Sequence, residues 1–88
     1  MAEQETLLEF PCDFPLKIMG QTHEEFQQIV VGIVTKHAPD FDSSTLEVRA
    51  SSGGKYVSLT CTVVATSKPQ LDALYMELTG HPMVKVVL

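Results

Sequence analysis

The chain is short of residues on which several classes of protein depend. It has no tryptophan, two cysteines and six Lys or Arg residues, against eleven Asp or Glu residues, in a length of 88. Phosphate binding needs clustered positive charge, so the net charge of −5 argues against a nucleic-acid partner. No apolar run approaches the ~20 residues of a membrane helix, so no membrane partner is predicted. The first five residues, MAEQE, are acidic where a secretory signal is basic, and a cytoplasmic protein is expected.

The side chains that carry most catalytic and metal chemistry are few and scattered. Cys12 and Cys61 match no redox or zinc spacing, and we expect them to be buried apolar residues or free thiols. The three histidines fall near a helix start, a helix end and a loop, with no metal-ligand spacing. No nucleophile with a base and no phosphate loop is recognisable. The sequence therefore predicts no enzymatic activity, no metal site and no cofactor.

What the sequence does contain is an alternation of strand and helix patterns within one domain. Residues 1–13 are acidic and without a clear period, and are expected to form a partly mobile segment before a domain over 14–88. Alternating apolar and polar residues predict strands over 14–19, 45–51, 56–65 and 83–88. Gly53-Gly54 predicts a hairpin turn between the second and third strands. In the last strand, Val84, Val86 and Leu88 are expected to face the core.

Two helices are predicted from apolar residues at helical spacing. The first would begin after Thr22 as N-cap, with Glu25 completing a capping box. The second would begin after Ser67, with Gln70 in the capping-box position, and would end at a left-handed Gly80. The order βαββαβ predicts the α+β class and a ferredoxin-like fold, a four-stranded antiparallel sheet with two helices on one face. The expected core comprises Phe26, Ile29, Ile33, Leu59, Val63, Leu71, Leu74 and Val86.

A set of short segments along nearly the whole chain carries a family resemblance. They are Leu8-Glu9-Phe10-Pro11, Phe14, Lys17-Ile18-Met19-Gly20, His37-Ala38-Pro39, residues 51–56 (SSGGKY), Ser58, Leu74-Tyr75 and Val86-Val87-Leu88. With these segments the chain resembles the YbeD-like family of small bacterial proteins of unknown function. It departs from the family at Asp40-Phe41-Asp42, where related chains often carry a glycine-containing turn.

The resemblance has implications for fold and function. It implies a ferredoxin-like fold similar to the ACT-type regulatory domains, which bind amino acids and control metabolic enzymes. It implies no enzymatic activity. Genes for such proteins tend to lie near those for lipoate attachment, which connects the family loosely with that pathway.

Two kinds of binding function are left open. A regulatory or adaptor module would hold a small anionic metabolite at the loop after the first strand, as ACT-type domains do; its residues here are Met19, Gly20, Gln21 and Thr22. A simple turn and a helix cap would explain the same residues. The alternative is an unknown protein partner on the open sheet face, at Lys17, Arg49, Tyr56, Ser58, Thr60 and Lys85. Uncovered edges and one uncovered face also predict a weak homodimer.

Overall fold

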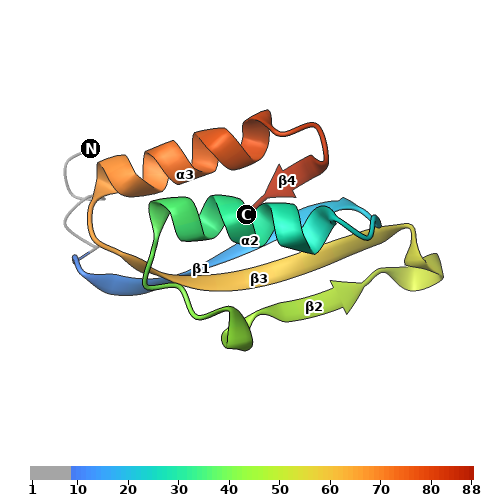
Figure 1. The fold of residues 1–88 in the computed structure, drawn as a ribbon, viewed down its shortest axis with the longest axis horizontal. Helices are drawn as coiled ribbons and strands as arrows, with labels where there is room; N and C mark the ends of the chain where they lie inside the picture. Colours follow the sequence, from blue (N-terminus) through green and yellow to red (C-terminus); the bar gives the residue numbers. More distant parts are fainter. Residues whose placement is uncertain (1–8) are drawn as a thin grey trace.

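The computed structural model describes residues 9–88. Its elements are β1 (Cys12–Gln21), α2 (Phe26–His37), β2 (Glu47–Ala50), β3 (Tyr56–Ala65), α3 (Lys68–Gly80) and β4 (Val84–Val87). Two short 3-10 turns, η1 (Ser43–Thr45) and η2 (Ser52–Gly54), flank β2. The strands form one antiparallel sheet in the order β2-β3-β1-β4, and α2 and α3 run antiparallel beside each other (Figure 1). This is the predicted βαββαβ architecture.

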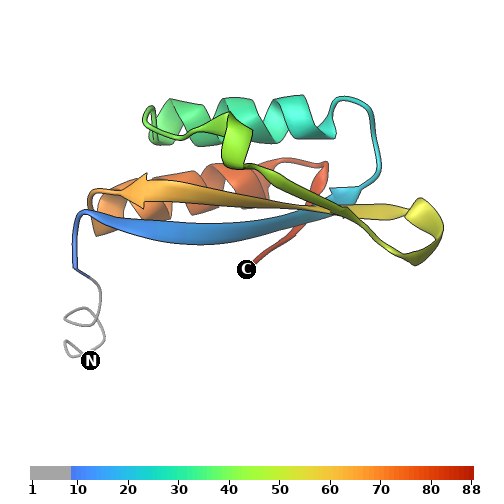
Figure 2. The ribbon, with the colours of Figure 1, turned by 90° about the horizontal axis from the view of Figure 1, so that it is seen from below.

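One face of the sheet is buried beneath the two helices. The alternation of β1 and β3 directs Leu16, Ile18, Leu59, Cys61 and Val63 to that face, where each is at most 2% exposed. The apolar stripes of α2 and α3 cover them and complete the core; Figure 2 shows α2 above the sheet from the side. Burying one such side chain contributes about 1.5–3 kcal/mol, so this layer is the main source of stability.

The start of the domain differs from the prediction. β1 begins at Cys12 and not at Phe14, because Cys12 and Asp13 pair with Ala65 and Val64 on β3. The boundary placed after residue 13 therefore falls inside a strand. Residues 9–11 of the predicted mobile segment belong to no strand or helix, and residues 1–8 lie outside the described residues.

The predicted N-cap of the first helix is also wrong. α2 begins at Phe26 with Glu25 at the N-cap position, and no side chain caps it. Thr22 instead donates its hydroxyl to the carbonyl of Gly54 at 2.6 Å. The physical reason is that β1 continues to Gln21, which pairs with Tyr56, so the chain reaches Thr22 beside the β2–β3 hairpin.

The second helix begins as predicted and ends differently. Ser67 caps α3, its hydroxyl oxygen accepting from the backbone N–H of Gln70 at 3.2 Å. The Gln70 side chain also donates to the carbonyl of His37 at 2.9 Å, so it ties the end of α2 to the start of α3. Gly80 is the last helical residue and is not left-handed; the positive-φ glycines of residues 9–88 are Gly53 and Gly54, which make the predicted hairpin turn.

The last strand contradicts the expected facing of its side chains. Val84 and Val87 are buried, whereas Val86 is 42% and Leu88 is 67% exposed. A bulge causes this change, because Gly20 pairs with Val84 while the adjacent Met19 pairs with Val86. The bulge leaves Lys85 without a partner in the β1–β4 register. Val86 therefore does not belong to the core, contrary to the prediction. Ile29 and Leu71, also predicted as core residues, are partly buried and pack against the core cluster.

The second strand is shorter than predicted, and its side chains are exposed. β2 covers Glu47–Ala50 where 45–51 was expected, because Ser43–Thr45 forms η1. Val48 is 54% exposed although it stands on the helix-facing side of the sheet, opposite Leu59. In Figure 1, β2 lies along the border of the sheet, beyond the reach of either helix.

Candidate functional site

The loop predicted to hold a ligand is packed against the protein itself at Gly20. A Cβ atom added there would lie 2.3 Å from the carbonyl oxygen of Met83 and 2.6 Å from the ring of Phe26. Real Cβ atoms do not approach other atoms so closely, so the Met83 backbone just before β4 and the Phe26 ring of α2 require glycine at this position. Gly20 is thus explained by the packing of two elements of the chain.

Thr22, in the same loop, is hydrogen-bonded to the turn of the β2–β3 hairpin. The backbone N–H of Thr22 donates to the carbonyl of Lys55 at 2.9 Å, next to the hydroxyl contact with Gly54. Gln21 is exposed at the end of β1, and Met19 is half-buried on the open sheet face, the face opposite the helices. Ligand binding at residues 19–22 stays a prediction, and the hydrogen-bonding capacity of Thr22 is largely used within the fold.

The structure brings most of the predicted interaction face together. Cross-strand pairs join Lys17 to Thr60 and Tyr56 to Gln21, and Ser58 lies between Met19 and Arg49. Five of the six predicted residues thus share the open sheet face; Lys85 lies apart at the β4 bulge. Sequence reasoning placed Val86 and Leu88 in the core, whereas both are exposed on this face, where they adjoin Met19 and Lys17.

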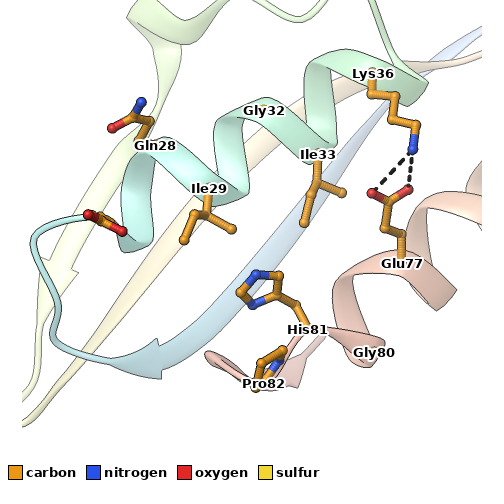
Figure 3. Close-up of a pocket in the computed structure, with 10 residues that line it drawn as sticks. Gln28, Ile29, Gly32, Ile33, Lys36, Glu77, Gly80, His81 and Pro82 are labelled. Carbon is orange, nitrogen blue, oxygen red and sulfur yellow. Dashed lines mark hydrogen bonds and ion pairs between the residues drawn. The ribbon is translucent and has the colours of Figure 1, made fainter.

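A hollow that the sequence did not predict lies between the two helices. This α2–α3 groove has a volume of about 740 Å³ and is lined by Glu25, Gln28, Ile29, Gly32, Ile33, Lys36, Glu77, Gly80, His81 and Pro82. Figure 3 shows Ile29 and Ile33 directed from α2 toward the His81 and Pro82 side. A Cβ atom at Gly32 or Gly80 would meet no atom of the described residues within 4 Å, so both positions border an open space.

His81 presents a hydrogen-bond donor in the groove. Its Nδ1 accepts from the backbone N–H of Met83 at 3.1 Å. The neutral ring therefore carries its proton on Nε2, which is left to donate to another group. The ring is half-buried between α2 and Pro82 (Figure 3), so this polar group lies beside the apolar side chains of Ile29 and Ile33.

A three-residue charge cluster closes one end of the groove. Glu77 of α3 accepts from Nε2 of His37 at 2.7 Å and from Nζ of Lys36 at 3.2 Å. The hydrogen bond from His37, followed by that from Lys36, holds the pKa of the Glu77 carboxyl below its ordinary value. The cluster joins α2 to α3 and places an ammonium group beside the apolar groove.

One feature of the sequence is a weak sign of the groove. Glycine inside a helix costs about 1 kcal/mol relative to alanine, and Gly32 lies in the middle of α2 with no crowding to require it. The charge cluster could not be foreseen in this way, because Lys36 and Glu77 are 41 residues apart in the chain.

The remaining chemistry of the described residues is limited. Burial raises the pKa of the Cys61 thiol to about 11, so this thiol stays protonated and poorly nucleophilic near neutral pH. Within residues 9–88, no three His, Cys, Asp or Glu side chains converge as metal ligands would. No helix in the same range has the length and apolar character to cross a membrane.

Solved structures of other proteins share this architecture. The solution structure of protein HP0495 from H. pylori matches 92% of this chain and 85% of its own, with a TM-score of 0.75 and 13% identity. The ACT domain of GTP pyrophosphokinase from Chlorobium tepidum matches 86% of this chain and 84% of its own, with a TM-score of 0.65 and 18% identity. These likenesses establish the class, an ACT-like ferredoxin fold.

The chain belongs to the family described as "Protein of unknown function (DUF493)", whose model matches residues 5–88. A UPF0250 protein of Nitrosomonas europaea is 58% identical over 97% of this chain and 98% of its own length. A UPF0250 protein of Chromobacterium violaceum is 55% identical over 98% of this chain and 97% of its own. These findings confirm the family resemblance seen in the sequence, and the family description names no activity.

Proposed function

We propose that this protein is a non-enzymatic regulatory or adaptor module that binds a small molecule in the α2–α3 groove. The observation that carries the proposal is the groove itself, an open hollow of about 740 Å³ whose lining combines three apolar side chains with five polar or charged ones. Binding sites for small molecules commonly have volumes of about 300–1,000 Å³ and this mixture of surfaces. The ACT-like fold supports the proposal by analogy only.

The lining indicates the chemistry of the ligand. Ile29, Ile33 and Pro82 offer an apolar surface, while Nε2 of His81 and Nζ of Lys36 are donors beside it. Lys36 has three donor hydrogens and, among residues 9–88, hydrogen-bonds to Glu77 alone, so it has capacity for another acceptor. The matching ligand is a small metabolite with an apolar body and an anionic end. Lipoate has this character, so lipoate is one of the compounds to test, and its binding would support the predicted link to lipoate metabolism.

An NMR titration with amino acids, keto acids and lipoate tests the groove. Saturable shifts should centre on Ile29, Gly32 and His81, and Gly32→Leu should abolish them by filling the hollow. Thr35→Leu is the matched control, because it adds the same side chain to an exposed position of α2 outside the groove. Shifts that survive Gly32→Leu, or that centre on residues 19–22, would refute this location.

A second candidate function uses the open sheet face to bind a protein. The observation that favours it is the exposed apolar group of Val86, Leu88 and Met19 beside the polar strands β1 and β3. A patch of mixed apolar and polar character suits a reversible protein contact. If a partner is captured by the wild-type chain and lost with Val86→Asp but not with Gly32→Leu, the face and not the groove carries the function.

A further inference from the structure

The two outer edges of the sheet are not equivalent, and β4 is the protected one. Lys17 and Leu88 exchange backbone hydrogen bonds of 3.1 and 2.8 Å, so the neighbouring Val87 directs its backbone polar groups away from β1. The hydroxyl of Tyr75, on α3, donates to the carbonyl of Val87 at 2.5 Å. A side chain of the same molecule thus occupies the outer edge of β4, which is one way that proteins prevent an edge strand from pairing.

Among the described residues, none protects the edge at β2 in this way. Ser51 donates to the carbonyl of Tyr56 at 2.8 Å, and the same register pairs Arg49 with Ser58 and Glu47 with Thr60. Because hydrogen-bonded and non-hydrogen-bonded pairs alternate, the N–H and C=O groups of Val48 and Ala50 point outward from the sheet. No group within residues 9–88 forms a hydrogen bond with them across this border. Neither α2 nor α3 covers β2 (Figure 1).

The sequence of β2 is complementary to itself in charge. An antiparallel copy related by a two-fold axis at Val48 places Glu47 opposite Arg49 of the second copy, and Arg49 opposite its Glu47. The hydrogen-bonding pattern also fits this register. Val48 of one copy would lie opposite Val48 of the other, and the outward N–H of each would donate to the outward C=O of its partner. The Glu47–Arg49 pairs then take the non-hydrogen-bonded positions, where Cα atoms are only about 4.5 Å apart.

We propose that two copies of this chain pair antiparallel through β2, about a two-fold axis at Val48, and so join their sheets into one. The same surface serves both copies, as in other symmetric dimers. Two reciprocal Glu47–Arg49 pairs set the register, and within residues 9–88 neither side chain has an ion-pair partner in its own copy. The strand is four residues long, so the dimer is weak and reversible. The α2–α3 groove is not part of this surface.

Charge reversal tests both the dimer and its register. Arg49→Glu sets Glu against Glu across the axis, and Glu47→Arg sets Arg against Arg. Each variant alone should dimerise roughly tenfold or more weakly than the wild type, because attraction becomes repulsion in both pairs. An equimolar mixture of the two variants should recover the dimer, since every pair is again of opposite charge. Sedimentation equilibrium at constant ionic strength measures all four samples.

A control and a second readout separate the edge from the sheet face. Lys17→Glu reverses a charge on the open face of the central strand β1, and should leave the association unchanged. The amides of Val48 and Ala50 should become more protected from hydrogen exchange as the wild-type concentration rises. A wild type that stays monomeric at millimolar concentration would overturn the proposal. So would failure of the mixture to dimerise, or equal disruption by Lys17→Glu.

Discussion

Gly20, near the end of β1, and Gly32, in the middle of α2, have very different surroundings. Gly20 has the carbonyl of Met83 and the ring of Phe26 within 3 Å of the position that a Cβ atom would take. Gly32 has nothing within 4 Å of the corresponding position. One glycine is required by packing, and the other leaves an open surface in the groove.

This difference gives a matched pair of substitutions. Gly20→Ala should lower the free energy of unfolding by about 1–3 kcal/mol, because the backbone at Met83 or the ring of Phe26 must move. Gly32→Ala should raise it by about 0.5–1 kcal/mol, since alanine restricts the unfolded chain and fits the helix. Urea unfolding followed by circular dichroism measures both. Equal stability of the two variants would contradict the close packing at Gly20.

At the scale of the elements, the alternation of apolar and polar residues predicted a strand correctly where one face of that strand is buried along its whole length. β3 covers residues 56–65 as predicted, because its alternation is long and its apolar face meets both helices. The same rule failed at β4, where Val86 and Val87 are adjacent valines. Either of them could face the core, and a bulge opposite Met19 and Gly20 decides between them. A bulge leaves no mark in so short an alternating pattern.

The helix caps show that distant contacts can override a local sequence pattern. Ser67 caps α3 as its sequence predicted, since within residues 9–88 its side chain hydrogen-bonds to no other element. Thr22 has the right residue type for a cap, but the hairpin turn supplies carbonyl partners at Lys55 and Gly54. Those partners lie more than thirty residues away in sequence, so a local pattern could not reveal them.

Adjacent valines in β4 provide a direct test of the bulge. Val87 is 5% exposed and Val86 is 42% exposed. Val87→Ala should lower the free energy of unfolding by about 2 kcal/mol, because it removes buried methyl groups at about 0.8 kcal/mol each and leaves a cavity. Val86→Ala should cost about 0.5 kcal/mol or less, as exposed substitutions do. The reverse order in urea unfolding would restore the register predicted from the sequence.

The contact between α2 and α3 should make stability depend on acidity. The pKa of Glu77 is lowered by His37 and Lys36, so its carboxylate is favoured in the folded state. Its contribution is therefore fully present above its ordinary pKa of 4.5 and is lost as the pH falls through the lower, folded-state pKa. Glu77→Gln should be less stable than the wild type at neutral pH, with the difference closing in acid.

Unfolding curves collected from pH 7 to pH 3 measure that difference. Glu24→Gln is a suitable control, because Glu24 is exposed and its side chain has no hydrogen bond within residues 9–88. A gap between Glu77→Gln and the wild type that stays constant with pH would show that the carboxylate does not stabilise the helix pair.

At the scale of the whole molecule, the fold was predictable and the groove was not. Element order and apolar periods specify a two-layer arrangement with few alternatives. The groove depends on which side chains α2 and α3 leave uncovered where they diverge, and it combines residues from 25 to 82. Its charge cluster forms only after the helices pack, because Lys36, His37 and Glu77 come from different elements.

Ile33 lies between the core and the groove, and its substitution tests whether the molecule unfolds as one unit. Its side chain is 9% exposed, belongs to the core cluster and also lines the groove. Ile33→Ala should lower the free energy of unfolding by about 2–5 kcal/mol, toward the lower end because the groove side has no packing to lose. Helical circular dichroism and the fluorescence of Tyr56 and Tyr75 should report one shared midpoint, since a single core connects both helices to the sheet. Separate midpoints, with the helices melting before the tyrosine signal changes, would show that α2 and the sheet are not one cooperative unit.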